Sequence, residues 1–399
     1  MLEIAFLFII LFNNIILKIL PTNQIFNYWD ELVFGIIVVL WGIKSKRRGR
    51  IEKKYVVTFL EMLVIVVVGI MGNIILKYQT SASAIIRDIV GFLKFPLSIL
   101  ALHNLNLSKR IAAKFYQIIP LIKLLLIIIF VLGIISLNID LGMSQPEYRH
   151  GVHPYMFLFV HPTYLTTFEI IILLALNAVK ECTLIDEIVV LLTIALGMRT
   201  RGFILIAMYI FIKYAGKLFE KVKILGGIIV SALIIAVSYS KLMLYVSYAS
   251  SPRETLYKGG LELARKCMPI GSGFGSFASH LSAKTMSNVY NVIHIEGMYN
   301  NNGTVSPVIG DAGYPYYIGQ FGILGLGLIT FLTINLVKMT KKNIYKDNIF
   351  SINMMWWMIA ISLITETILV NDGVEIAVMM AVIEELSKMR CQLDVNSKS

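Results

Sequence analysis

Long apolar runs recur from one end of the chain to the other, and they constrain its fold more than any other feature. The runs at 55–76 and 116–137, for example, are long enough to cross the ~30 Å hydrocarbon core of a bilayer as helices. In lipid, backbone polar groups have to be satisfied within their own segment, which selects helices. A membrane barrel would show alternating stretches of about ten residues instead. We therefore expect an all-α polytopic membrane protein.

The composition also indicates that the chain is surrounded mainly by lipid rather than by water. Hydrophobic residues make up 57% of the chain and charged residues only 15%, whereas soluble domains carry roughly 25% charged residues. The formal net charge of +12 could suggest nucleic-acid binding, but the basic residues cluster in short loops between the apolar runs. That distribution is typical of the cytoplasmic loops of membrane proteins, so we expect no nucleic-acid partner. The three cysteines have neither disulfide nor zinc-site spacing.

Twelve apolar runs are candidate membrane spans, and the basic residues between them predict their orientation. Most of the 36 Lys and Arg residues fall in one set of alternate loops, which places both termini on the cytoplasmic side. The chain is then a single integral membrane domain, 1–399, with a smaller outer loop at 138–159 and a large extracytoplasmic loop, containing short helices, at 241–312. The predicted spans are 2–20, 29–43, 55–76, 84–102, 116–137, 160–179, 182–198, 202–216, 224–240, 313–336, 349–370 and 374–388.

Two arginines at the turn between the short runs 182–198 and 202–216 are the first candidate site residues. Because both runs are short, the turn that carries Arg199 and Arg201 should lie slightly beneath the outer surface. Recessed charge in a membrane protein commonly marks a ligand or ion path, although snorkelling to the lipid head groups would explain it too. The smaller outer loop and the residues after it add further polar candidates on this side. They are Arg149, His150, His153 and His161.

The large outer loop opens with a capping-box pattern that contains two more candidates. Ser251, Pro252 and Glu254 occupy the cap, first and third positions of an expected helix. Glu254 is therefore first of all a helix cap and secondly a candidate catalytic carboxylate. Arg253 places a cation at a helix N-terminus, where it opposes the helix dipole. A bound anion would offset that cost, because the free backbone N–H groups would help to hold it.

A glycine-rich run follows at 269–277, and a carboxylate stands before the next apolar run. The run reads Pro-Ile-Gly-Ser-Gly-Phe-Gly-Ser-Phe. A compact turn explains it better than a phosphate-binding nest, since the strand and lysine of a P-loop are missing. Asp311 lies at the outer mouth of the span 313–336, where it could act as a base or simply favour the helix dipole. A stripe of glycines within that span predicts close packing against another helix.

Several carboxylates fall inside predicted spans, where ionisable groups are functional candidates by default. Those near the outer ends of their spans are expected to pair with the outer arginines or to line a cavity that opens outward. They are Asp30, Glu31, Asp88 and Glu366. The spacings of a metal-binding carboxylate pair and of an HExxH site are missing, so no metal is expected. His103 lies on the cytoplasmic side and has no predicted role.

The order of these motifs is itself informative. Gly197-Met198-Arg199-Thr200-Arg201-Gly202 ends one span, a long outer loop with Arg253 and the glycine-rich run follows, and Asp311 precedes Gly322-Ile323-Leu324-Gly325. That order, over roughly residues 150–330, resembles the O-antigen ligase and polymerase superfamily. Asn27-Tyr28-Trp29-Asp30-Glu31 is also similar to the second-span entry of capsule and exopolysaccharide repeat-unit polymerases. Ligase relatives generally have a His-Asn pair where this chain has Asp311-Ala312, which favours the Wzy-type polymerase branch.

The resemblance implies a GT-C-like membrane glycosyltransferase in a bacterial cytoplasmic (inner) membrane. Such an enzyme joins undecaprenyl-diphosphate-linked oligosaccharide units on the outer face and releases undecaprenyl diphosphate. Arg199, Arg201 and Arg253 would hold the diphosphate, because a guanidinium binds phosphate oxygens bidentately. Asp311, or in second place Glu254, would accept the hydroxyl proton. No cofactor is implied, and the partners would be the lipid-linked oligosaccharide, the lipid bilayer, a chain-length regulator and a flippase.

Other functions stay open at the level of the sequence. An O-antigen ligase would transfer the same kind of glycan to another acceptor. A glycosyltransferase that uses polyprenyl-phosphate sugars would typically carry acidic motifs in its first outer loop, but here that loop, 21–28, is uncharged. A flippase or transporter for lipid-linked oligosaccharides would also need many spans and recessed charges, although the two halves of the chain show no inverted repeat.

Overall fold

The fold was determined as a computed structural model, which describes residues 2–19, 28–48, 53–105, 107–149, 151–215, 252–285, 287–294, 312–342, 344 and 349–396. The structure is mostly helical (78%), and the described residues form no β-strand, which confirms the all-α class. Two isolated antiparallel bridges, Ser144 with Tyr155 and Arg149 with Val152, are the β-type pairs of the described part.

The helices follow the apolar runs closely. Each predicted span that the structure describes is largely helical, and the run 224–240 lies outside the described residues. The elements are α1 (Leu2–Ile19), α2 (Trp29–Arg48), α3 (Lys53–Leu76), α4 (Ala82–Asn104), α5 (Leu107–Gln117), α6 (Ile119–Ile135), α7 (Pro162–Ala178), α8 (Leu184–Leu196), α9 (Thr200–Ile210), the π-helix η2 (Phe211–Ala215), α12 (Pro252–Lys266), α13 (His280–Lys284), α14 (Val289–Val292), α15 (Gly313–Lys341), α16 (Ile349–Ser362), α17 (Ile368–Asn371) and α18 (Gly373–Asn396).

A small number of these helices are long and apolar enough to cross a membrane. Lys54–Leu76 and Gly313–Lys341 qualify alone, and α5 with α6 form a third candidate that is bent by 67°. The protein is therefore a membrane-associated helical protein, but the expected dozen spans are not confirmed. Two physical reasons explain part of the shortfall. Helices α8 and α9 have 13 and 11 residues, short of the ~20 that a bilayer requires, and α2, α4 and α18 carry several charged side chains.

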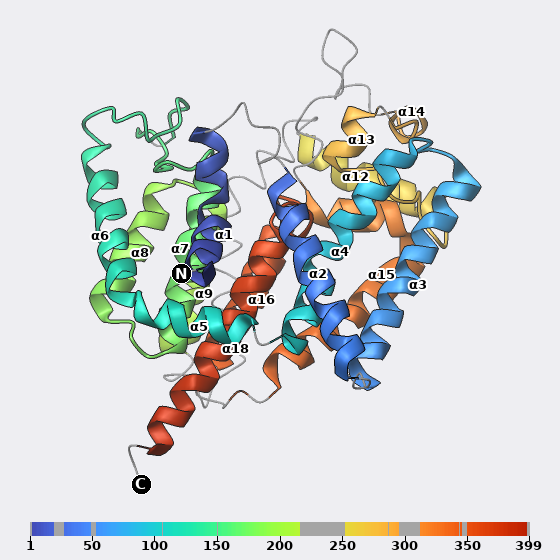
Figure 1. The fold of residues 1–399 in the computed structure, drawn as a ribbon. Helices are drawn as coiled ribbons and strands as arrows, with labels where there is room; N and C mark the ends of the chain where they lie inside the picture. Colours follow the sequence, from blue (N-terminus) through green and yellow to red (C-terminus); the bar gives the residue numbers. More distant parts are fainter. Residues whose placement is uncertain are drawn as a thin grey trace.

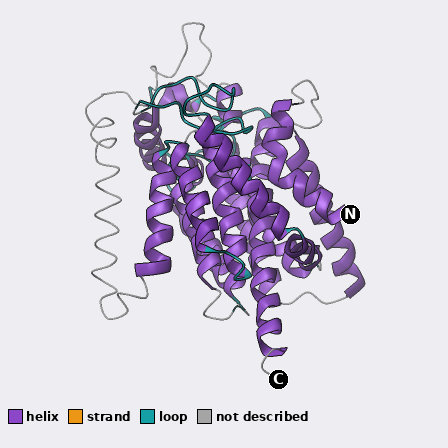
Figure 2. Ribbon diagram, turned by 90° about the vertical axis from the view of Figure 1, so that its left-hand side faces the viewer, coloured by secondary structure: helices purple, strands orange, loops and turns teal. Residues whose placement is uncertain are grey.

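Most of the described helices run side by side, and the loops gather mainly at one end (Figures 1 and 2). Helix α18 runs through the middle of the bundle and contacts α4, α5, α7 and α16. Its residues Ile376–Ile383 are all buried, as are Ile170–Leu176 of α7. These two helices form the core around which the others pack. The short helices α12–α14 and the 136–161 loop lie at one end, and α5 lies across the bundle at the other (Figure 1).

Helix α15 is broken where the glycine-rich run inserts into it. Gly322 has φ +60°, which is outside helical geometry, and a Cβ on Gly271 would lie 2.4 Å from the Gly322 nitrogen. The break frees carbonyls that the inserted run then uses, because Ser272 N donates to Gly319 O at 3.0 Å and Gly273 N to Gln320 O at 2.9 Å. The prediction that the glycine stripe packs against another helix is wrong, because Gly322 approaches the backbone of this loop and Gly319 approaches the Phe277 side chain.

The next two N–H groups of the run are held by side chains from α3 and α4. Phe274 N donates to Asn73 Oδ1 at 2.8 Å, and the Asn73 amide donates back to Phe274 O at 2.9 Å. Gly275 N donates to Asp88 Oδ2 at 2.7 Å, and the same oxygen accepts from Tyr316 at 3.1 Å. Four successive N–H groups are therefore used within the protein. The run is a compact buried turn, and the phosphate-nest hypothesis is wrong because such a nest needs unpaired N–H groups.

Candidate functional site

The smaller outer loop is folded back onto the turn that carries the recessed arginines. Tyr155 anchors it twice, since its backbone N–H donates to Leu196 O at 3.0 Å and its hydroxyl donates to Ile129 O at 2.8 Å. Gln145 N donates to Pro154 O at 2.9 Å and closes the loop into a narrow arm. The arm brings Gln145 and Arg149 to the end of α8, which the sequence separates from them by about fifty residues.

Arg199 stands at the N-cap of α9 and faces this arm. The preceding residue, Met198, has φ +48°, a left-handed turn that separates α8 from α9. The Arg199 guanidinium donates to the Gln145 side-chain oxygen, and its Nε has no hydrogen-bond partner among the described residues. Burial is the main cause that lowers the pKa of Arg199 to about 10; the charge of Arg149 also lowers it, that of Glu147 raises it, and that of Arg253 lowers it. Three arginines from separate segments are therefore close enough to influence one another, and Arg149 is paired with Glu147 at 2.9 Å. The remaining excess of positive charge favours an anion.

Arg201 lies deeper and is more fully engaged. It is 4% exposed, and it donates to Thr163 O at 2.7 Å and to Thr167 Oγ1 at 2.6 Å. It also forms an ion pair with Glu366, and Asp372 interacts with it electrostatically. The predicted pairing of an embedded carboxylate with an outer arginine is confirmed for Glu366. A charge buried this deeply is stable only with such partners, so Arg201 ties α9 to α7 and to the segment after α16.

His161 stands between the arm and α7. Helix α7 begins at Pro162, so His161 precedes the helix rather than lying within a span, and its Nδ1 accepts from Thr163 N at 3.2 Å. Burial, and after it the charges of Arg199, Arg201 and Arg149, lower the pKa of His161 to about 4. The imidazole is therefore neutral near pH 7. It sits beside the arginines in the protonation state that can accept a proton.

Helix α12 positions Arg253 and Glu254. Arg253 is half-buried on the first turn, and one turn later the Tyr257 hydroxyl donates to Ile364 O at 3.0 Å. Glu254 forms an i,i+4 ion pair with Lys258. The expected helix after Ser251 is confirmed, although Ser251 itself lies outside the described residues, so the capping box is not tested. Packing of α12 along α15 fixes the orientation of this helix.

The turn between α16 and α17 joins the elements of the site. Leu363 O accepts from Gly313 N at 2.9 Å and from Tyr314 N at 3.0 Å, which caps the start of α15. Ile364 O holds α12 through Tyr257, and Glu366 holds α9 through Arg201. One short turn thus fixes α15 and the two helices that carry candidate residues, α9 and α12. A small pocket near this end, between α1, α2 and α18, is lined by three carboxylates. They are Asp30, Asp372 and Glu375.

Three other acids predicted near the outer ends of spans make contacts that stabilise the fold. Asp30 and Glu31 both pair with Lys94 of α4, at a distance of 2.7 Å for Glu31, rather than with the outer arginines. Asp30 also lines the pocket just described. Asp88 neither pairs with an arginine nor lines that pocket, because it is committed to the glycine-rich run. The expectation is wrong for Asp88, since a buried carboxylate takes the nearest backbone donor.

The predicted candidates are thus brought together in part. Arg149, Arg199, Arg201, Arg253 and His161 lie at one end of the molecule, whereas His153 is exposed, bonded to Gln145 O at 3.0 Å and stacked edge-on with Tyr148. Asp311 and His150 lie outside the described residues. The described part of the chain contains no group of three or more His, Cys, Asp or Glu that could hold a metal ion.

Gln145 and Asp372 belong to the site but were not singled out from the sequence. Gln145 is an isolated polar residue in an irregular loop, and no spacing relates it to Arg199. Asp372 stands in Asn371-Asp372-Gly373, which is typical of a turn. Comparison of the whole chain with protein-family models, characterised proteins and solved structures found no match.

Proposed function

We propose that the protein is a membrane glycosyltransferase that polymerises undecaprenyl-diphosphate-linked oligosaccharide repeat units. It would act at the outer face of a bacterial cytoplasmic membrane, with about twelve spans and both termini in the cytoplasm. The observation that carries the proposal is the convergence of Arg149, Arg199 and Arg253 from three separate segments at one end of the bundle. Positive charge at this end suits a diphosphate leaving group.

Internal charge pairing supports the larger number of spans. Charged residues are costly in lipid unless they pair inside the bundle. Three of the charges that make α2 and α4 polar do so, since Lys94 of α4 binds Asp30 and Glu31 of α2. Helix α18 is buried over Ile376–Ile383 and is shielded from lipid by its neighbours. A central helix can therefore cross the membrane with charges that would exclude a lipid-facing one.

The chemistry follows from the groups at this end. A hydroxyl oxygen of one lipid-linked unit attacks the anomeric carbon of the growing chain, and a new C–O bond forms. The bond between that carbon and the diphosphate oxygen breaks, and undecaprenyl diphosphate leaves with the electron pair. The hydroxyl proton passes to a base, for which Asp311 is the first choice and Glu254 the second. His161 is a further candidate, because its imidazole is neutral near pH 7.

The arginines divide the work on the leaving group. Arg199 has an Nε that no described residue accepts from, and Arg253 is half-buried, so these two are placed to bind phosphate oxygens as bidentate donors. Arg201 is held by Thr163, Thr167 and Glu366. Its charge acts on the diphosphate from beneath, in a buried environment where screening by water is weak.

The test is the length distribution of the surface glycan in a strain that lacks the gene. Complementation with the wild type should restore a ladder on a gel, whereas Arg199→Ala and Arg253→Ala should leave only single lipid-linked units. Arg265→Ala is the matched control, because Arg265 is exposed near the far end of the same helix α12 as Arg253. Protein abundance in the membrane is measured for each variant.

Three outcomes would contradict the proposal or its assignment of the arginines. Long polymer that stays on its lipid carrier and fails to reach its final acceptor would indicate a ligase. Single units trapped in the inner leaflet would indicate a transporter. If both arginine variants are expressed and still give a ladder of normal length, the arginines are not required for polymerisation.

A further inference from the structure

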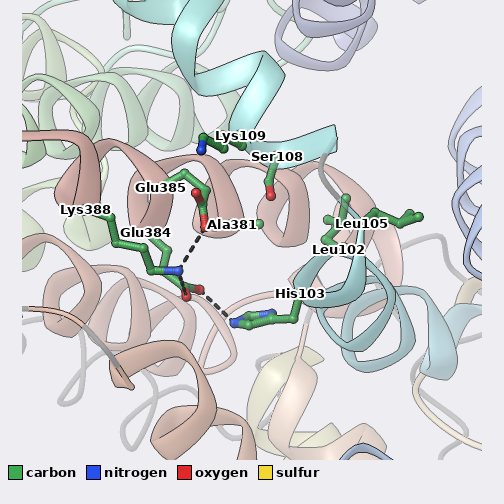
Figure 3. A pocket seen from close by; sticks show the side chains of 9 residues that line it. All are labelled: Leu102, His103, Leu105, Ser108, Lys109, Ala381, Glu384, Glu385 and Lys388. Carbon is green, nitrogen blue, oxygen red and sulfur yellow. Dashed lines mark hydrogen bonds and ion pairs between the residues drawn. The ribbon is translucent and has the colours of Figure 1, made fainter. Parts of the chain in front are cut away.

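A second cavity lies at the opposite end of the bundle from the arginine cluster. It has a volume of ≈ 110 Å³ and lies between the end of α4, the start of α5 and the second half of α18 (Figure 3). One water needs only roughly 10–15 Å³ on this kind of measure, so the cavity has room for a larger polar group. Its lining includes His103, Ser108, Lys109, Glu385 and Lys388.

The wall formed by α18 presents carboxylates. Lys388 binds Glu384 at 2.6 Å and Glu385 at 2.9 Å, and His103 Nε2 lies 2.7 Å from the other oxygen of Glu384. Both oxygens of Glu384 are therefore engaged. A carboxylate can accept about four hydrogen bonds, and Glu385 makes one ion pair within the described residues. This wall retains acceptor capacity, chiefly at Glu385.

The wall formed by α5 presents donors. Ser108 is 5% exposed, its hydroxyl is directed into the cavity in Figure 3, and it makes no hydrogen bond to a described residue. Lys109 also lines the cavity and has no ion pair within the described part of the chain. Both residues belong to the first turn of an 11-residue helix, where backbone N–H groups lack helical partners and the dipole favours an anion. A buried unpaired hydroxyl, an ammonium group and a helix N-terminus together provide a phosphate site.

The position of α5 indicates where such a phosphate comes from. The helix is bent by 67° from α6 and lies across the end of the bundle (Figure 1). Its buried face consists of Ser108, Ile111, Ala112 and Phe115, and Lys109 and Arg110 are exposed. A basic amphipathic helix at the end of a membrane bundle lies at the depth of the lipid head groups. We propose that this cavity binds a phospholipid head group that carries both a phosphate and a primary ammonium.

The two walls then bind opposite ends of one head group. The phosphate is bound by Ser108, Lys109 and the start of α5, and the ammonium is bound by Glu385. A trimethylated ammonium would bind less well, since it has no N–H to donate. The inference is independent of the proposed glycosyltransferase activity, because it concerns residues at the other end of the molecule.

The test measures lipid retention by the purified full-length protein with native mass spectrometry. The probes are phosphatidylethanolamine, phosphatidylglycerol and phosphatidylcholine, offered in equal amounts, and inorganic phosphate is tested separately for its effect on the melting temperature. The wild type should retain phosphatidylethanolamine roughly tenfold better than the other two, the size expected for one charge-assisted hydrogen bond. Lys109→Gln should lower the retention of both phosphatidylethanolamine and phosphatidylglycerol. Glu385→Gln should remove only the preference between them.

Controls and contrary outcomes separate the walls. Lys114→Gln is the matched control, because Lys114 is on the same helix and donates to Gln117 rather than lining the cavity. Ser108→Ala provides a second, milder probe of the phosphate end. Equal loss in Lys109→Gln and Lys114→Gln, or equal retention of the three lipids by the wild type, would overturn the proposal. Stabilisation by inorganic phosphate without retention of phosphatidylethanolamine would overturn the lipid assignment.

Discussion

Replacement of Asn73 by leucine is predicted to open the glycine-rich run. Asn73 makes two hydrogen bonds to Phe274, one to its N–H at 2.8 Å and one to its carbonyl at 2.9 Å. Both backbone groups are buried with Phe274, which is fully enclosed. Leucine has a similar size but no polar atoms, so the change leaves one donor and one acceptor unsatisfied in the core.

The magnitude follows from the two orphaned groups. A buried unsatisfied polar group costs about 1–3 kcal/mol, so the pair should cost about 2–6 kcal/mol. Each 1.4 kcal/mol is a factor of ten, so the open population of the run should rise roughly 30-fold to 20,000-fold. Asn73→Asp keeps the acceptor for the Phe274 N–H and loses only the donor, which should give an intermediate effect.

The assay is the rate of thiol labelling of Cys267 in native membranes. Cys267 is 3% exposed and its carbonyl accepts from Gly271 N at 2.9 Å, so its thiol becomes accessible when the run opens. Cys182 and Cys391 are first replaced by serine. Ile75→Ala, at an exposed position of the same helix, is the control and should change the rate little. Labelling of Asn73→Leu at the wild-type rate would refute the assignment of the run as a buried turn held by Asn73.

Three further changes test the packing of the site in unfolding experiments on the purified protein. Gly271→Ala should destabilise by at least about 2 kcal/mol, because φ is +75° and the new Cβ would lie 2.5 Å from Gln320 O; an unchanged melting temperature would contradict the inserted turn. Glu366→Ala should cost about 3 kcal/mol by leaving Arg201 buried without its ion pair, and Arg265→Ala should not. Because the folded-state pKa of His161 is lowered from 6.5 to about 4, its contribution to stability is present above pH 6.5 and is lost as the pH falls towards 4; His161→Gln should lack that loss.

The sequence predicts the helices well because the apolar runs are long and the solvent is uniform. In lipid, the backbone N–H and C=O groups have to form their hydrogen bonds within their own segment, which leaves the helix as the single outcome. Helices α3, α6 and α7 accordingly begin and end close to the predicted limits. The boundaries fail where charge interrupts the pattern. The span predicted at 349–370 is helix α16 followed by a turn and α17, and the helix predicted at 374–388 extends to Asn396.

The contacts within the site could be predicted in kind but not in detail. Burial in a membrane requires a partner for each charge, so a carboxylate for an outer arginine is expected, and Glu366 is the one found. The partner of Arg199 is Gln145, in an arm that has no periodicity and whose position depends on Tyr155. The break in α15 could not be predicted from the sequence either, because it depends on the contact between Gly322 and the distant Pro269–Gly275 turn.

The most direct test of the central claim uses the purified protein in liposomes. Lipid-linked single units, extracted from the strain that lacks the gene, are the substrate, and products are analysed by mass spectrometry in a buffer that contains a chelator. The account predicts products spaced by one repeat unit, with one undecaprenyl diphosphate released for each linkage, and a large loss of product with Arg199→Ala or Arg253→Ala but not with Arg265→Ala. Units that cross the liposome membrane without being joined would contradict it.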